Sequence, residues 1–231
     1  FPDTFSLRFI DEDHGEAIPF HEAFDLVAVT GMTQQIKRAY AICDAFRSKG
    51  VYTVIGGIHA SIFPEEAAKH TDTVITGEGE AAFVRFLEDF MGGCPERMYK
   101  AGEYVDLTAS PTPRYDLTSP ELYTSYSIQT TRGCPRTCAY CTLPVIYGAV
   151  YRHKEVEQVI REIRAIKAVS PNAFIFFADD NMFIHREHSL KLLRAIADEH
   201  ITWGTQTDIS VADKPEIARP DAGGFLLVWK M

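Results

Sequence analysis

The chain has 231 residues, 46% of them hydrophobic, and a formal net charge of −9 at pH 7. This length allows one large or two small domains, and the dispersed acidic charge weighs against a nucleic-acid partner, because phosphate binding requires a basic face. No apolar run approaches the roughly 20 residues of a membrane-spanning helix. No export signal precedes the first strand, so we expect reduced cysteines and a cytoplasmic location.

The first half of the chain alternates predicted strands and helices. Strands are predicted at residues 6–10, 24–30, 51–55 and 73–76. A long helix should run from an N-cap at Thr33 through residue 49, with Gly50 as its stop signal. Shorter helices are predicted at 64–69 and along the Phe83–Phe90 stripe. The alternation indicates a doubly wound α/β domain with a parallel sheet, which we place at residues 1–105.

Three glycine-containing loops follow the predicted strands of this domain. They are Thr30-Gly31-Met32-Thr33, Gly56-Gly57-Ile58-His59 and Gly77-Glu78-Gly79. Ligands of parallel sheets bind beyond the carboxyl ends of the strands, where glycine allows close backbone approach and helix N-termini favour a phosphate. One such loop is more often only a tight turn. Three such loops at the same edge of the sheet leave two interpretations equally open, a ligand site or three ordinary turns.

Residues 106–124 are predicted to be a linker between two domains. The segment is rich in proline and shows little periodicity, and proline fixes extended backbone while removing hydrogen-bond donors. A buried arm is the alternative, with apolar anchors at Tyr115, Leu117, Leu122 and Tyr123.

Residues 125–231 are predicted to form the start of a parallel βα array. Strands are expected at residues 126–130, 173–178, 201–205 and 225–229. Amphipathic helices should cover Val156–Ile166 and Leu190–Ile196, and a short helix should begin at Pro215 and end before Pro220. Polar side chains follow the second and third strands, as Asp179-Asp180-Asn181 and Gln206-Thr207-Asp208. They can cap the following turns, or accept hydrogen bonds from an ammonium group or a ribose.

The most informative stretch is the Cys134-x3-Cys138-x2-Cys141 loop, which holds three of the five cysteines. Three thiolates on one loop can bind three corners of a metal cluster and leave the fourth open for chemistry. A structural zinc site needs a fourth ligand, but Cys43 and Cys94 are single and distant. The pattern therefore favours an iron–sulfur cluster over zinc, over a disulfide framework and over three inert thiols.

This cysteine loop, with Tyr140 before its last cysteine, resembles the cluster loop of radical S-adenosylmethionine (SAM) enzymes. The runs Thr131-Arg132-Gly133-Cys134-Pro135 and Phe177-Ala178-Asp179-Asp180-Asn181 resemble the subgroup that carries an N-terminal cobalamin-binding domain. The resemblance implies a Rossmann-like cobalamin-binding domain followed by a partial (β/α) barrel of the radical SAM type, here at residues 125–231.

The resemblance also implies a chemistry and its cofactors. Cys134, Cys138 and Cys141 would bind a [4Fe–4S] cluster that cleaves SAM reductively to a 5′-deoxyadenosyl radical. Cobalamin would then serve methyl transfer to a small-molecule substrate, although some relatives carry out ring closure or rearrangement. Such an enzyme needs an electron donor such as flavodoxin or ferredoxin.

Cofactor contacts can be carried over residue by residue. Tyr140, Asp179, Asp180 and Gln206 are expected to contact SAM or to line its pocket. The cobalamin contacts are expected in the glycine loops, at Thr30, Gly31, Met32, Thr33, Gly56, Gly57, His59, Gly77, Glu78 and Gly79. The cobalt-ligating D-x-H-x-x-G loop of such domains is not matched by residues 11–15, so His14 is expected to be a solvated loop residue. No catalytic residue is assigned.

The chain departs from the family at both ends. The first strand and helix of the cobalamin-binding domain are expected to be missing before Phe1, and about half a barrel fits after Tyr126. The family's acidic ribose contact finds no match near the C-terminus, so the sequence is expected to be a fragment whose own activity is open. Two alternatives remain: a tRNA methylthiotransferase-like enzyme, which needs further N-terminal cysteines, and an inactive cobalamin or iron–sulfur binding module.

Overall fold

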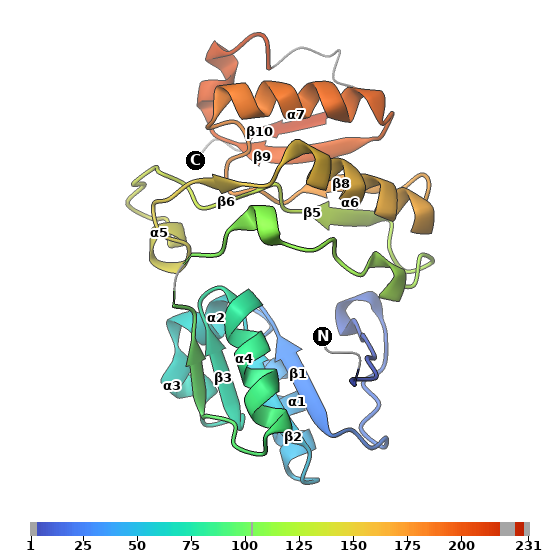
Figure 1. Cartoon of the computed structure of the whole chain (residues 1–231), viewed down its shortest axis with the longest axis vertical. Helices are drawn as coiled ribbons and strands as arrows, with labels where there is room; N and C mark the ends of the chain where they lie inside the picture. The colour runs from blue at the N-terminus through green and yellow to red at the C-terminus, as the bar shows by residue number, and fades with distance from the viewer. Residues whose placement is uncertain (1–3, 103, 218–224, 229–231) are drawn as a thin grey trace. The chain divides into compact units, whose positions relative to one another are not determined.

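The computed structural model describes residues 4–102, 104–217 and 225–228, and the chain divides into two compact units (Figure 1). Unit 1 comprises Phe1–Ser6 and Ala17–Val105, and unit 2 comprises Leu7–Glu16 and Asp106–Met231. The segment Leu7–Glu16 thus packs with the second half of the chain, although it lies near the N-terminus. The predicted strand at 6–10 is wrong, because these residues are irregular and do not join the sheet of unit 1.

Unit 1 is built on a four-stranded parallel sheet in the order β1-β2-β3-β4. The strands are β1 (Leu26–Thr30), β2 (Tyr52–Gly56), β3 (Thr73–Thr76) and β4 (Met98–Lys100). The sequence predicted the first three and missed β4, a three-residue edge strand with one buried side chain, Tyr99. So short a strand carries too little alternation to be recognised without its neighbour β3.

The helices of unit 1 cover both faces of this sheet. They are α1 (Ile36–Arg47), α2 (Ile58–Ile62), α3 (Pro64–Ala67) and α4 (Gly79–Met91). Ile55 and Val74 belong to the core beneath α1, whereas their chain neighbours Val54 and Ile75 belong to the core beneath α4. Successive strand residues point to opposite faces, so this division places helices on both sides and confirms the doubly wound α/β prediction.

The start of α1 differs from the predicted one. The N-cap residue is Gln35, and Thr33 lies outside the helix with its hydroxyl 3.3 Å from Nδ1 of His59. A threonine followed by a helical stripe is a frequent capping signal, but here the hydroxyl contacts His59 of α2 instead of the helix amides. The predicted N-cap is therefore wrong.

Unit 2 also contains a four-stranded parallel sheet, in the order β10-β9-β8-β5. Its strands are β5 (Ser125–Ile128), β8 (Phe174–Phe177), β9 (Trp203–Thr207) and β10 (Phe225–Val228). All four overlap the predicted strands, although Trp229 lies outside the described residues. Strands that neighbour one another in chain order are what the start of a βα barrel requires.

The other elements of unit 2 lie around this sheet. They include the helices α5 (Leu143–Ile146), α6 (Val156–Val169) and α7 (Arg186–Asp198), and the antiparallel pair β6 (Thr131–Arg132) and β7 (Arg152–His153). The helix predicted from Pro215 is wrong for residues 215–217, which form a turn after a 3₁₀ helix at Ile209–Asp213; Pro220 lies outside the described residues. The core of the unit consists of the buried stripes of α6 and α7 against β5, β8 and β9.

The proline-containing segment after residue 105 is anchored to unit 2. Leu107 and Tyr115 are buried, and the Gln158 side-chain amide donates to the carbonyls of Leu107, Thr108 and Ser110 at 2.9–3.2 Å. Nearby, the His14 ring stacks on that of Tyr123, with 4.1 Å between ring centroids, and His14 remains exposed, as expected for a solvated residue. Of the four expected anchors of a buried arm, Tyr115 is buried, Leu117 and Tyr123 are half-buried, and Leu122 is exposed.

Across the described part of the chain, none of the helices combines the length and the apolar character that crossing a bilayer demands.

Candidate functional site

The cysteine loop of unit 2 begins directly after β6 and leads to α5. Cys134 is buried, Cys138 is exposed and Cys141 is half-buried, and the Cys141 amide donates to the Cys138 carbonyl at 3.0 Å. All five cysteines are free thiols. Cys43 lies in the core beneath α1 and Cys94 follows α4, so both belong to unit 1. The structure therefore brings three of the five cysteines to one loop.

The electrostatics of this loop indicate which group the thiols fit. Burial raises the pKa of the Cys134 thiol, and the nearby Asp180, Cys141 and Cys138 raise it further. A thiolate at Cys134 is therefore disfavoured unless positive charge lies beside it, which bound iron would supply. In an iron–sulfur cluster each thiolate binds its own iron, so three thiols on one loop fit a four-iron cluster that keeps one iron open.

Tyr140 lies on the exposed side of the same loop, with 63% of its surface accessible. A hydrogen bond with the Cys138 thiol raises the pKa of the Tyr140 hydroxyl. The ring is therefore available to a ligand at the loop surface, and its predicted contact with SAM stays a prediction.

The two aspartates after β8 contact the backbone that precedes Cys134. Asp179 Oδ1 accepts from the Thr130 and Thr131 amides at 2.6 and 2.8 Å, and its Oδ2 accepts from the Thr130 hydroxyl at 2.5 Å. Asp180 Oδ2 accepts from the Gly133 amide at 3.1 Å. Burial raises the pKa of Asp179 to about 6, despite these donors, and also raises the pKa of Asp180. Their predicted contact with SAM stays a prediction.

A second polar chain joins the cysteine loop to the end of β9. Arg136, between the first two cysteines, forms an ion pair with Asp208 at 3.2 Å. Asn181 donates to Asp208 at 2.7 Å and accepts from the Thr207 hydroxyl at 2.9 Å. The sequence placed Asn181, Thr207 and Asp208 at strand ends but left open whether they cap turns or belong to the site. It gave no role to Arg136, whose only signal is an arginine inside a cysteine loop. The side chain of Gln206 is exposed, and its predicted role stays open.

Gly133 has a steric role that its place in the motif did not show. Its φ is +83°, and a Cβ there would lie 2.2 Å from the Val150 carbonyl oxygen. Only glycine combines this left-handed backbone with so close an approach. The cysteine loop is thus packed against the segment that leads into β7.

In unit 1, the three glycine loops meet at the carboxyl edge of the sheet. Thr30 pairs with Gly56 in register, and a Cβ on Gly57, whose φ is +101°, would lie 2.8 Å from Thr30 Oγ1. The Gly77 amide donates to Ser61 Oγ at 2.9 Å, which ties the third loop to α2. The structure therefore brings the predicted loops together, while their individual cobalamin contacts stay predictions.

Two polar side chains at this edge are buried: His59, which lies in α2 and not in a loop as expected, and Glu78 of the third loop. His59 is 6% exposed, with Nδ1 near the Thr33 hydroxyl and Nε2 3.5 Å from Glu66 Oε1. Glu78 is buried and accepts from the Val105 amide at 2.9 Å. Both side chains thus brace loops, whereas the neighbouring Met32 is exposed at the surface.

In unit 1, glycine loops meet at the carboxyl ends of the strands. In unit 2, a three-cysteine loop lies near the carboxyl ends of its strands. The chain is therefore an α/β protein with two candidate cofactor sites. Residues 11–87 match the family model of the B12 binding domain, and residues 128–219 match that of the radical SAM superfamily. The chain belongs to the radical SAM proteins that carry a cobalamin-binding domain. The resemblance read from the cysteine loop is confirmed.

Named relatives agree with this assignment. The chain is 32% identical over 223 residues to bacteriochlorophyllide d C-12(1)-methyltransferase of Chlorobaculum tepidum, covering 93% of this chain and 49% of the relative. It is 29% identical to hopanoid C-2 methylase of Rhodopseudomonas palustris, and the match covers 94% of this chain and 43% of that relative. The fold is similar to that of TsrM from Kitasatospora setae, a radical S-adenosylmethionine methyltransferase solved with cobalamin and a [4Fe–4S] cluster. The two share 20% identity with a TM-score of 0.72, and the match covers 91% of this chain and 50% of TsrM. The chain spans about half the length of these proteins.

Proposed function

We propose that this chain is part of a cobalamin-dependent radical SAM enzyme that transfers a methyl group to a small-molecule substrate. The observation that carries the proposal is the presence of both family domains on one chain, with the three-cysteine loop at the strand ends of unit 2. Methyl transfer is favoured because the relatives above are named as methyltransferases or a methylase. Reduced thiols make the cytoplasm the proposed location.

Each part of the chain has a defined task in this proposal. Cys134, Cys138 and Cys141 would ligate three irons, and the glycine loops of unit 1 would allow the corrinoid tail to approach the backbone. When bound, the cluster supplies the electron for reductive cleavage of SAM and cobalamin carries the methyl group. The protein's own groups orient these cofactors and exclude water. The electron itself must come from outside, so we propose a flavodoxin or ferredoxin as partner.

The cluster assignment can be tested by anaerobic reconstitution with iron and sulfide. Cys134→Ala, Cys138→Ala and Cys141→Ala should each abolish iron–sulfur absorbance, whereas Cys43→Ala and Cys94→Ala should retain it. Equal iron loading in the triple variant and the parent would disprove the assignment. The parent should bind about four irons per chain, and a content near twice that would favour the methylthiotransferase alternative.

The corrinoid assignment has a matched pair of glycines. Gly57→Leu should block cobalamin binding, because the side chain would enter the space between the first two loops. Gly50→Leu carries comparable backbone strain, with φ at +79°, but has open space around its Cβ. Loss of binding in the first variant alone supports the site, while equal binding in both contradicts it. Cobalamin binding without 5′-deoxyadenosine release from SAM would favour the binding-module alternative.

A further inference from the structure

We propose that Asp179 and Asp180 are positioning residues that fix the backbone of residues 130–133 and so set the cysteine loop for its cluster. The inference relies on the proposed function only in taking Cys134, Cys138 and Cys141 as iron ligands. It gives the two carboxylates a different task from the SAM contact expected by resemblance.

The first argument is where the sheet hydrogen bonds end. The last hydrogen bond between the two strands is donated by the Ala178 amide, one residue past the end of β8, to the carbonyl of Ile128, the last residue of β5, at 2.9 Å. The chain then turns away to form β6, which leaves the next amides without a neighbouring strand on that side. Thr130 and Thr131 are buried, so their amides need an acceptor. The carboxylate of Asp179 provides it.

The second argument is that Asp179 is buried and that most of its acceptor positions are already occupied. It is 2% exposed, and its two oxygens accept three hydrogen bonds from the two threonines. A carboxylate has about four acceptor positions. An ammonium group of a ligand would have to displace these donors or pass through the core to reach it. The geometry therefore favours a backbone support over a ligand contact.

The third argument is the link to the first cysteine. Asp180 holds the Gly133 amide, and Gly133 is the residue that must pass the Val150 carbonyl with φ at +83°. Cys134 follows immediately. The two adjacent carboxylates thus restrain the chain on both sides of Arg132, up to the residue that precedes the first iron ligand.

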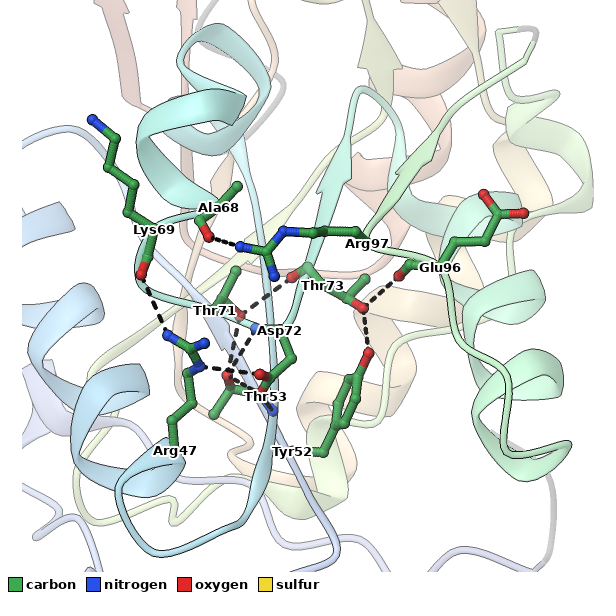
Figure 2. Close-up of polar contacts among 10 residues, drawn as sticks. All are labelled: Arg47, Tyr52, Thr53, Ala68, Lys69, Thr71, Asp72, Thr73, Glu96 and Arg97. Carbon is green, nitrogen blue, oxygen red and sulfur yellow. Dashed lines mark hydrogen bonds and ion pairs between the residues drawn. The ribbon is translucent and has the colours of Figure 1, made fainter.

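Unit 1 contains the same interaction in a different place (Figure 2). Asp72 Oδ2 accepts from the Thr53 amide and hydroxyl, both at 2.9 Å, where β2 and β3 begin. This is the opposite edge of the sheet from the glycine loops. Asp72 is therefore a matched control, because its removal breaks the same kind of bond far along the strands from any proposed ligand.

The test separates geometry from charge by comparing two substitutions. Asn at position 179 keeps an acceptor for both amides and can donate to the rotated Thr130 hydroxyl, whereas Ala keeps nothing. If Asp179 has a positioning role, Asp179→Asn should release iron to a chelator at a rate within about twofold of the parent. Asp179→Ala should release it at least about tenfold faster than the parent. Asp180→Ala should lie between them, since it loses one bond.

SAM binding gives the opposing outcome. If Asp179 were an ammonium ligand, Asp179→Asn would keep its iron but lose the SAM-induced change in the electron paramagnetic resonance spectrum of the reduced cluster. Positioning predicts that this change is retained. Parent-like iron release in Asp179→Ala would also overturn the inference. If the parent itself binds no iron, the proposed function fails instead.

A readout on the cluster-free chain does not depend on loading. Cys134 and Cys43 are both buried thiols, one in each unit. Asp179→Ala should raise the alkylation rate of Cys134 at least about tenfold and leave that of Cys43 unchanged. Asp72→Ala should leave the alkylation rate of Cys134 unchanged. Unchanged Cys134 reactivity in Asp179→Ala would contradict a positioning role. If Asp179→Ala fails to fold, Asp180→Ala, which removes a single bond, carries the same comparison.

Discussion

The two units use the same interaction, an aspartate that holds a threonine amide and hydroxyl, at opposite edges of similar parallel sheets. In unit 1, Asp72 lies where strands begin, is partly exposed and is paired with Arg47 at 3.0 Å. In unit 2, Asp179 lies where strands end and is buried beside the like charge of Asp180. The chemistry of a motif therefore does not define its role. Its position along the strand direction does, since ligand sites of parallel sheets form at the carboxyl edge.

The largest expected difference between the two units comes from removing each aspartate. Asp179→Ala leaves two buried amides and a hydroxyl without their acceptor, at a cost of about 3–5 kcal/mol in the free energy of unfolding of unit 2. Asp72→Ala should cost unit 1 only about 1–2 kcal/mol, because water can reach its partly exposed position. Both tryptophans lie in unit 2, so urea unfolding followed by tryptophan fluorescence measures that unit alone.

Unit 1 stability can be followed by the urea dependence of Cys43 alkylation. A loss for Asp179→Ala no greater than that for Asp72→Ala would show that burial does not separate the two interactions.

The second comparison is between the crowded glycines. Gly133→Ala places a Cβ against the Val150 backbone carbonyl, which cannot move without shifting the chain, and should cost unit 2 about 2–4 kcal/mol. Gly57→Ala meets the Thr30 side-chain hydroxyl, which can rotate, and should cost unit 1 about 1–2 kcal/mol. The same two unfolding probes measure these losses. A larger loss at Gly57 would mean that the strand-end loop of unit 1 is the more rigid one.

The third comparison concerns pH and lies within unit 2. The pKa of Asp179 is raised from 3.8 to about 6 by burial, so the folded carboxyl binds its proton more tightly than the unfolded one. Its contribution to stability is therefore lost as pH rises from about 4 through about 6, by on the order of 3 kcal/mol at about 1.4 kcal/mol per pKa unit. Asp179→Asn should abolish this loss in urea unfolding across that range.

His188 provides the opposite slope in the same range. Burial, followed by the charges of His153 and His185, lowers the pKa of His188 to about 4 from its ordinary 6.5. Between pH 6.5 and 4 the histidine is protonated in the unfolded state but mostly neutral in the folded state. The free energy of unfolding therefore falls as pH drops from 6.5 towards 4. His188→Gln should flatten this acid-side loss. Parallel pH curves for the parent, Asp179→Asn and His188→Gln would contradict both assignments.

The smallest effects are expected from the two ion pairs. Arg136 and Asp208 are 56% and 33% exposed, so Arg136→Ala should change unit 2 stability by less than about 0.5 kcal/mol, an effect that added salt removes. Arg47 also donates to the Lys69 carbonyl, and Arg47→Ala should cost unit 1 about 1 kcal/mol (Figure 2). A loss above 1 kcal/mol for Arg136→Ala would show that this pair helps to hold the cysteine loop.

The sequence was a good guide where neighbouring residues carry the signal. Helical stripes such as that of α6 and apolar runs such as β8 identify buried faces from a few consecutive residues, because the 3.6 and 2.0 periodicities are local properties. It was a poor guide at residues 6–10, where an alternating run lies in a segment that packs with the other unit. A strand exists only if a partner strand is beside it, and no local pattern reports that partner.

By itself, the sequence determined the α/β alternation and the three-cysteine loop, because ligand spacing and periodicity are fixed by consecutive residues. Only the tertiary structure decided what surrounds that loop. The partners of Asp179 are 48 and 49 residues away in the chain, and its burial depends on the pairing of β5 with β8. An aspartate after a strand can cap a turn, bind a ligand or hold a neighbouring backbone. The strand that folding places beside it selects among these roles.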